Sequence, residues 1–466
     1  MRRATDNPAD TRLERQLEQL NAVLPAGLEA DLSAPADVIT TPSTAAQFAY
    51  LKKHVLVHRD VLGLALEVIN GIPAEGDSRV EVTWPPEGTH GMGAIRPRRI
   101  FVGNRDLSRV IREIRTRLAD SDPTVESDPA AAAFPKVSRV HIMSVTGGNL
   151  CSADEPAPTT RPLKPPLAGD DNAGSGVQVT ICDTGLVYGY QQHSWLRTGV
   201  TGDVGAPNSH LDAAQTILPH AGHGTFVAGV LRSAAPGAEV YVSNAMRYIG
   251  AAAEEEAGHA IMEALGSGDW PPIICLAAGT LTENDAFLLG LSDFLIALRD
   301  HHADTVLIAA AGNDGVTTKF WPAAHAVEPG WEDAVVSVGA LREDGQGRAC
   351  FSNHGDWVRV YAQGERMVNA FVTGVYSYDY DYTNRCRFYD PPLYLGCTCI
   401  APYFAHARVP FDTALAQWSG TSFAAPLVAA HIATYMSHHT GLKSRQAAAQ
   451  LVSGSLPVAD LSDLRV

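Results

Sequence analysis

The chain has 466 residues, of which 45% are hydrophobic and 18% charged, and it contains 41 glycines and 29 prolines. This composition is typical of a globular protein with many turns, and it excludes a coiled coil or a largely disordered chain. The formal net charge of −16 argues against a nucleic-acid-binding protein, whose surface is normally basic.

The N-terminus carries two arginines without an apolar stretch behind them, so we expect no signal peptide. No run of about 18 apolar residues follows, which argues against a membrane span. Seven cysteines, an odd number in a long chain, suit a reducing compartment better than a disulfide framework. We therefore predict a cytoplasmic protein that has neither nucleic acid nor a membrane as its partner.

Residues 1–140 mix helical and strand signals and predict a small α+β module. Apolar residues recur at helical spacing in two stretches, residues 11–24 and 43–69, whereas residues 79–84 alternate as in a strand. Residues 99–118 predict a strand, an Asp106 cap and an amphipathic helix. Residues 141–175 are rich in Pro, Gly and Asp and predict a linker.

Residues 176–466 have a different pattern. Short apolar runs, most of them ending at or just before Gly, Asp or Asn, alternate with helical stretches at residues 223–234, 252–268 and 284–302. Strands that are apolar on both faces and alternate with helices predict an α/β domain with a mostly parallel sheet. The active site of such a domain lies beyond the carboxyl ends of its strands.

Three short motifs follow one another in this part of the chain: Asp183 in "ICDTGL", His223 in "HGTFVAGV" and Ser422 in "SGTSFAAP". A nucleophilic serine needs a base that takes its proton and an acid that orients the base, so the ordered set predicts a catalytic triad. Gly420 would let a substrate backbone approach, and Pro426 is expected in the first turn of the helix that begins near Ser422.

A fourth motif, "AAAGNDG", places Asn313 at the end of a predicted strand. Its side-chain amide could donate a hydrogen bond to the oxyanion that forms during acyl transfer. Each motif alone is weak evidence, because Asp-Thr-Gly also ends ordinary strands and is a signature of aspartic proteases. The chain has one Asp-Thr-Gly and no Asp-Ser-Gly, however, whereas an aspartic protease needs two such carboxylates.

The four motifs resemble the signatures of subtilisin-like serine peptidases, over about residues 175–440. The resemblance implies a three-layer α/β fold with a mostly parallel central sheet. It also implies a serine endopeptidase that forms an acyl-enzyme on Ser422, with Asp183 orienting His223 and with Asn313 as the oxyanion donor. Intact catalytic residue types give no reason to prefer the alternative, a catalytically silent peptide-binding or regulatory protein on the same scaffold.

The resemblance also implies substrate contacts. An extended peptide would add to a sheet edge formed by the segment Leu276, Ala277, Ala278 and Gly279, and Asp314 follows the oxyanion donor. At Phe320 many relatives have a glycine that helps to form the floor of the main specificity pocket. The bulky ring predicts a shallow pocket and a preference for small side chains at the residue before the cut.

Other expectations concern partners and cofactors. Residues 364–418 form an insertion with Cys386, Cys397 and Cys399, which with His406 match no standard zinc spacing, so we predict no metal there. We expect no organic cofactor. Relatives often bind structural calcium, but no calcium loop can be mapped onto this sequence. Residues 1–140 are either a propeptide or a regulatory module that binds a partner, and the expected substrates are intracellular proteins or peptides.

Overall fold

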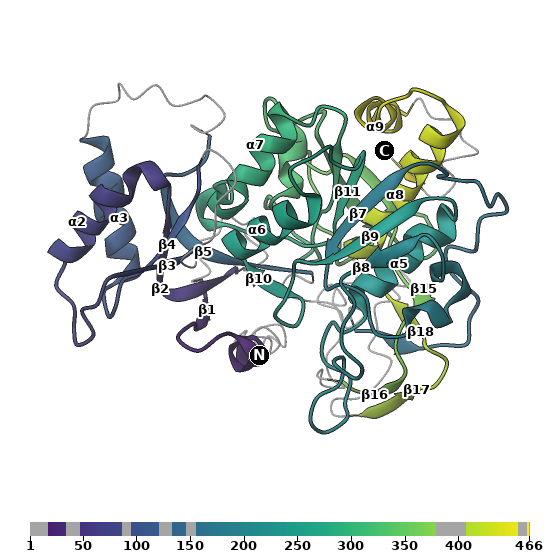
Figure 1. Cartoon of the computed structure of the whole chain (residues 1–466), viewed down its shortest axis with the longest axis horizontal. Coiled ribbons are helices and arrows are strands. Elements are labelled where there is room, and N and C mark those ends of the chain that lie inside the picture. Colours follow the sequence, from purple (N-terminus) through teal and green to yellow (C-terminus); the bar gives the residue numbers. More distant parts are fainter. Residues whose placement is uncertain are drawn as a thin grey trace, which may run out of the picture.

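The computed structural model describes residues 17–33, 47–85, 95–120, 133–145, 155–378, 407–454 and 464–465. Figure 1 shows a small α+β module at one end and a larger α/β part at the other. The cysteines of the insertion and His406 lie outside the described residues, and so do residues 11–16 of the first predicted helix. Residues 17–23 of that stretch are helical.

The larger part is built on an eight-stranded sheet in the order β19-β14-β13-β12-β11-β7-β9-β8. Seven neighbouring strands run parallel, and only β19 pairs antiparallel. The strands are β7 (Gln178–Asp183), β8 (Val200–Gly202), β9 (Glu239–Asn244), β11 (Ile273–Leu276), β12 (Val306–Ala310), β13 (Val335–Leu341), β14 (Val360–Gln363) and β19 (Leu464–Arg465). The predicted parallel α/β sheet is therefore confirmed.

Helices cover both faces of this sheet and make three layers. One apolar core lies under α5 (His223–Ala234), α8 (Thr421–His438) and α9 (Ser444–Val452), and a second lies under α6 (Glu254–Leu265) and α7 (Ser292–Asp300). The strands at the centre are buried on both faces, as their continuous Val, Ile and Leu runs predict.

The helix predicted over residues 284–302 is shorter than the sequence pattern suggests. We expected a helix over residues 284–302, but α7 covers only Ser292–Asp300. Asn284 has a positive φ of 57° in a short 3-10 segment, η6 (Glu283–Asp285), and a second 3-10 segment, η7 (Leu289–Leu291), precedes α7. The apolar residues before α7 face the core from a loop, a burial that periodicity alone does not distinguish from a helix.

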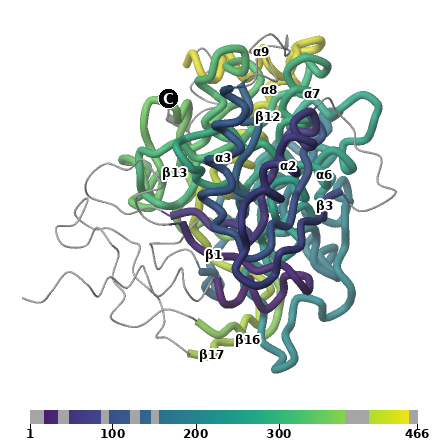
Figure 2. The backbone as a smooth tube through the Cα atoms, turned by 90° about the vertical axis from the view of Figure 1, so that its left-hand side faces the viewer, coloured from purple at the N-terminus to yellow at the C-terminus, as the bar shows by residue number. Residues whose placement is uncertain are grey.

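The module consists of an antiparallel sheet with two helices on one face (Figure 2). Its elements are β1 (Ala30–Leu32), β2 (Ala49–Val57), α2 (Leu62–Gly71), β3 (Glu81–Trp84), β4 (Arg98–Phe101), α3 (Leu107–Ala119) and β5 (Val137–Ser144). The side chain of Asp106 accepts a hydrogen bond from Arg109 N, so the predicted strand, cap and amphipathic helix are confirmed there.

The helical reading of residues 43–69 is wrong in part. Residues 49–57 form β2, and the helix begins only at Leu62. Val55, Leu56 and Val57 are fully buried because β2 lies between β4 and β5. Pairing on both sides overrides a local spacing that also fits a helix.

The two parts share one sheet. The short strand β10 (Ala251–Ala253) of the larger part pairs antiparallel with β5, at Ala252 and Met143. Residues 141–144 were expected to begin a linker, whereas they continue β5. Composition marks a Pro- and Gly-rich stretch, but it does not show where the preceding strand ends.

A second contact between the two parts is aromatic. Phe134, just before β5, is 2% exposed. Its ring centroid lies 5.5 Å from that of Phe287, 6.1 Å from that of Trp331 and 6.4 Å from that of His325. The module therefore inserts one ring into an aromatic box of the larger part.

Small elements complete the described chain. A three-stranded sheet joins β15 (Met367–Ala370), β18 (Leu415–Trp418) and β6 (Ala157–Pro158), and a two-stranded sheet joins β16 (Gly374–Ser377) and β17 (Arg408–Phe411). Further 3-10 turns are η2 (Arg59–Val61), η4 (Tyr190–Gln192), η5 (Ser194–Leu196) and η8 (Ala323–Val327). Within the residues described, no helix is long and apolar enough to cross a membrane.

Candidate active site

Asp183 is the last residue of β7 and is fully buried. Its carboxylate contacts His223 Nδ1 through both oxygens, at 2.8 and 2.9 Å, and Oδ1 also accepts a hydrogen bond from the Thr184 amide at 2.7 Å. Because the carboxylate accepts the hydrogen bond of Nδ1–H, the proton of the imidazole stays on Nδ1 and Nε2 is left as an acceptor.

His223 is the first residue of α5, and the neighbouring residues of both motifs hold the helix against β7. Thr184 Oγ1 accepts the Gly224 amide at 3.0 Å, and Thr225 Oγ1 accepts the Val187 amide at 2.9 Å. A side chain at Gly224 would collide with the carbonyl of the Gly185 loop. These contacts explain why the two motifs carry Thr and Gly at these positions.

Aromatic rings cover the histidine. The Trp418 ring meets His223 edge to face at 5.2 Å between centroids, and the Phe423 ring lies at 5.3 Å. His223 Nε2 is buried and has no hydrogen-bond partner among the described residues. The candidate base is therefore shielded from water with its lone pair unused.

Ser422 is the second residue of α8 and is 1% exposed. Its Oγ lies 2.8 Å from the carbonyl oxygen of Val145 and 3.1 Å from that of Ala277. Pro426 lies one turn further into α8 than we expected, at the sixth helical residue. It has no N–H to donate to the carbonyl of Ser422, so the helix there lacks one of its regular bonds.

Asn313 follows β12 and faces the start of α8. Its Oδ1 accepts hydrogen bonds from the Thr421 amide and the Thr421 hydroxyl, both at 2.9 Å. The Nδ2 donor lies toward Gly420, where an added Cβ would be 3.5 Å away. With its oxygen held in this way, the amide can offer a donor beside Ser422, the position that an oxyanion contact needs.

A residue that sequence reasoning did not single out anchors this loop. Asn353 Oδ1 accepts the amides of Asp314 and Val316 at 2.9 and 3.2 Å, and its Nδ2 donates to the carbonyl of Ala311 at 2.9 Å. Asn353 stands in the stretch "CFSNHG", where a polar residue that follows buried ones was the available signal.

The predicted substrate edge is occupied by the chain itself. Ser144 exchanges two hydrogen bonds with Gly279, at 3.0 and 3.1 Å, and the Val145 amide donates to Gly250 O at 2.9 Å. With Met143 paired to Ala252 in β10, the end of β5 lies between two backbones and leads to Ser422. The predicted segment Leu276–Gly279 thus lies beside an extended peptide, and the strand on the other side was not predicted.

The residues of the segment Leu276–Gly279 differ in the groups that they present to the occupying strand. Leu276 ends β11 with its side chain in the core, and Ala278 is 2% exposed. The hydrogen bonds of this segment to the occupying strand and to Ser422 come from backbone groups, namely the carbonyl of Ala277 and both polar groups of Gly279. The predicted substrate contact is therefore one of backbone pairing.

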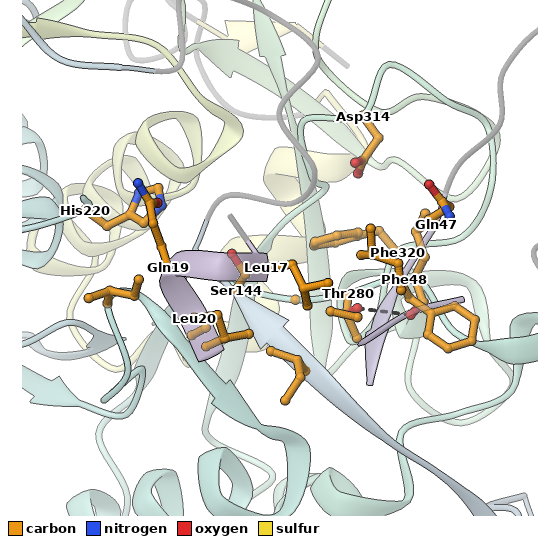
Figure 3. Close-up of a pocket in the computed structure, with 17 residues that line it drawn as sticks. Leu17, Gln19, Leu20, Gln47, Phe48, Ser144, His220, Thr280, Asp314 and Phe320 are labelled. Carbon is orange, nitrogen blue, oxygen red and sulfur yellow. Dashed lines mark hydrogen bonds between the residues drawn. The ribbon is translucent and has the colours of Figure 1, made fainter. Parts of the chain in front are cut away.

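Phe320 is 2% exposed, and its ring lies against the backbones of Gly279 and Gly312, where an added Cβ would collide with it. Asp314, Phe320 and Gly279 line a cavity of about 90 Å³ that residues Leu20 and Phe48 of the module close (Figure 3). The ring takes up space between the two glycine backbones, and the shallow specificity pocket stays a prediction.

Two thiols lie near the acid. Burial raises the pKa of Cys182 to about 12, and the neighbouring Asp183 adds to the rise. Burial also raises the pKa of Cys275 well above its usual value. Both thiols therefore stay neutral and act as small apolar side chains. Within the described part of the chain, no group of three or more His, Cys, Asp or Glu residues could hold a metal ion.

The protein has a three-layer α/β fold whose central sheet is mostly parallel and carries Asp183 at the carboxyl end of β7, and comparison with known proteins identifies the family. The model of the subtilase family (Peptidase S8) matches residues 174–463. The chain belongs to the subtilase family, and the resemblance noted in its motifs is confirmed.

A "Thermophilic serine proteinase" of Bacillus sp. (strain AK1) is 27% identical over 218 residues, which cover 44% of this chain and 48% of the relative. The chain thus matches about half the length of that relative. Among solved structures, a cold-adapted subtilisin-like serine proteinase has a TM-score of 0.41 and 19% identity, covering 66% of this chain and 92% of the other. Fervidolysin from Fervidobacterium pennivorans, a keratinolytic enzyme related to subtilisin, has a TM-score of 0.47 and 16% identity, covering 85% and 56%.

Proposed function

We propose that the protein is a serine endopeptidase in which Ser422 attacks the scissile carbonyl while His223 Nε2 takes its proton. Asp183 holds the ring and stabilises the imidazolium that forms. The observation that carries this proposal is the paired contact of Asp183 with His223 Nδ1, because it fixes the tautomer that a general base needs.

The remaining steps use groups at the start of α8. Negative charge that develops on the substrate oxygen meets the Nδ2 of Asn313 and the backbone N–H groups of the first helical turn. Collapse of the tetrahedral species breaks the C–N bond, and His223 returns the proton to the departing amine. Water then hydrolyses the acyl-enzyme on Ser422 with the same base.

Residues 137–145 are proposed to keep this cleft closed. They pair with both backbones that would bind a substrate, and the Val145 carbonyl takes the hydrogen bond of Ser422 Oγ. The module would then be an intramolecular occupant that must be cut or displaced before a protein substrate enters. Intact-mass measurement distinguishes the two routes, since cutting near Val145 requires Ser422 and displacement leaves the full chain.

The substrates proposed are proteins or peptides in extended form with a small side chain before the cut, because Phe320 fills the space between Gly279 and Gly312, where the family resemblance implies the specificity pocket. Intracellular substrates are favoured because the thiols of Cys182 and Cys275 are free and buried, which suits a reducing compartment.

Labelling with a fluorophosphonate probe tests the catalytic proposal. We expect Ser422 to be modified in the wild-type protein, with faster labelling once the module is displaced or cut, and no modification in His223→Ala. Asp170→Asn is the control, because this exposed carboxylate contacts His438 at the end of α8 opposite to Ser422. If the folded wild type, with or without the module displaced, is never labelled, the chain is a silent peptide-binding protein.

A further inference from the structure

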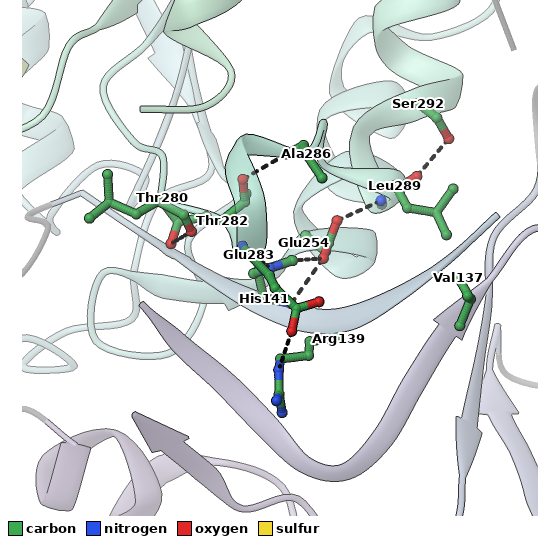
Figure 4. Close-up of polar contacts among 12 residues, drawn as sticks. Val137, Arg139, His141, Glu254, Thr280, Thr282, Glu283, Ala286, Leu289 and Ser292 are labelled. Atoms are coloured by element: carbon green, nitrogen blue, oxygen red, sulfur yellow. Dashed lines mark hydrogen bonds and ion pairs between the residues drawn. The ribbon is translucent and has the colours of Figure 1, made fainter. Parts of the chain in front are cut away.

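One contact of the occupying strand lies outside the catalytic groups. His141, in β5, is 1% exposed and reaches Glu254, the first residue of α6, which is fully buried (Figure 4). Glu254 Oε1 accepts two hydrogen bonds from His141, one from its backbone amide at 2.9 Å and one from its Nδ1 at 2.7 Å.

The larger part of the chain positions this carboxylate by itself. Glu254 Oε2 accepts the Gly290 amide at 2.7 Å. A side chain at Gly290 would collide with the backbone of Glu254 and Glu255, and one at Gly258 would collide with the Gly290 carbonyl. Two glycines thus allow η7 to lie directly against the start of α6 and fix the carboxylate.

The two oxygens of Glu254 have different roles. Oε2 is satisfied within the larger part, whereas both hydrogen bonds to Oε1 come from His141 of the occupying strand. An ionised buried oxygen without a donor is costly. The site is therefore complete only when a strand with a suitable donor lies in the cleft.

The contact of the second ring nitrogen of His141 limits which side chains fit this position. Its Nε2 lies 3.4 Å from the Glu283 amide and accepts its hydrogen bond. A neutral imidazole with its proton on Nδ1 satisfies both the Glu254 acceptor and the Glu283 donor. Lys and Arg offer donors only, and an aliphatic side chain offers neither. Among charged and apolar side chains, histidine alone completes the pair.

We propose that Glu254 and the Glu283 amide form a histidine-selective subsite for substrates, a proposal that rests on the peptidase function of the cleft. The pairing of Ser144 with Gly279 and of Met143 with Ala252 fixes the register. A protein substrate in the same register carries the recognised histidine four residues before the residue that replaces Val145.

Competition with peptides tests the subsite in the full-length protein. The background is His141→Ala, which weakens the internal occupant, and the probe is the rate of fluorophosphonate labelling of Ser422. The nonapeptide VSRVHIMSV and its versions with Ala, Arg or Gln in place of His are added as competitors. We expect the His peptide to protect Ser422 at concentrations about 10- to 100-fold lower than the Ala or Arg peptides, with Gln between them.

A second substitution assigns the effect to Glu254. In the same background, Glu254→Gln should reduce the His to Ala ratio to near one, because an amide cannot accept from both Gly290 and the histidine. Glu81→Gln, the same chemical change at an exposed position of β3, should leave the ratio unchanged. If His141→Ala does not fold, His141→Met serves as the background, because it keeps the volume without the donor.

Two failures are distinguishable. Equal protection by the His and Ala peptides, in a protein whose Ser422 labels normally, overturns the subsite and leaves the peptidase function intact. Absence of labelling contradicts the peptidase function. In that case the affinities of fluorescently tagged versions of the His and Ala peptides are measured by fluorescence anisotropy on the Ser422→Ala form of the background protein. A ratio of these affinities near one overturns the subsite.

Discussion

At the scale of single residues, two threonine hydroxyls hold the candidate base and acid in place. Thr184 and Thr225 accept amides from each other's segment, so the loop after β7 and the start of α5 are joined twice. The Asp183 to His223 contact is therefore built into the fold without a substrate. Substitutions at the proposed catalytic residues should therefore change reaction rates more than they change folding.

Asp183→Asn should lower kcat by about 10⁴-fold, because an amide at this position favours the wrong tautomer of His223. Residual activity is expected, since Ser422 and the oxyanion donors remain. Steady-state kinetics on one peptide gives the change, and a thermal unfolding scan checks the fold. A loss of less than about tenfold would show that Asp183 does not orient the base.

Asn313→Asp keeps the oxygen that accepts the two Thr421 bonds and removes the Nδ2 donor. We expect kcat to fall by about 100- to 1000-fold with KM little changed; the magnitude is that known for an oxyanion donor in a subtilisin, not one derived from this chain. A change confined to KM would place Asn313 in ground-state binding.

Phe320→Ala should open the pocket between Gly279 and Gly312. The kcat/KM ratio for a peptide with Phe before the cut, relative to one with Ala, should rise by at least about tenfold. Loss of a buried ring should also lower the free energy of unfolding by about 3–5 kcal/mol. An unchanged ratio in a folded variant would mean that the ring does not limit the pocket.

At the scale of secondary structure elements, the sequence predicts best where burial is continuous. The runs that became β7, β11 and β12 and the motif helix α5 were all foreseen, because a strand buried on both faces or a capped helix has a local signature. β2 and β10 were missed, since a spacing that fits a helix can be overridden by pairing, and a three-residue Ala strand has no signature. The occupied cleft was beyond prediction for the same reason.

Two buried histidines at β2, His54 within the strand and His58 directly after it, make the stability depend on pH. Burial lowers the pKa of His54 to about 4 and that of His58 to about 4, from 6.5. Between pH 6.5 and pH 4 these two histidines bind more protons in the unfolded chain than in the folded one. The stability that is present above pH 6.5 is therefore lost as the pH falls toward 4. Hydrogen exchange of β2 should accelerate from pH 7 to pH 5 more than that of β12, after correction for intrinsic rates. His54→Gln with His58→Gln should flatten this dependence, and an unaltered profile would contradict it.

At the scale of the whole molecule, charge joins the two parts. Arg99 of the module lies 2.7 Å from Glu255 and 3.0 Å from Glu256, and all three side chains are largely or fully buried. Burial raises the pKa of Glu255 to about 8, although Arg99 opposes the rise. The guanidinium of Arg99 is thus needed to stabilise the buried carboxyl groups of Glu255 and Glu256 at the start of α6.

Arg99→Met should loosen the module, because removing one partner of a buried ion pair costs about 3–5 kcal/mol. The labelling rate of Ser422 by a fluorophosphonate should increase as the cleft opens more often. Arg79→Met, at an exposed ion pair within the module, should not change the rate. Labelling of Arg99→Met at the wild-type rate would show that this pair does not hold the module.

The aromatic box around Phe134 has a consequence for the solution behaviour of the chain. Departure of the module would uncover the aromatic side chains of Phe287, His325 and Trp331 and would leave the backbone of β10 without its partner strand β5. Exposed aromatic rings and an unpaired strand promote self-association. The larger part prepared without residues 1–145 should therefore aggregate at high concentration. The module would then serve as a built-in solubility cover as well as an occupant of the cleft.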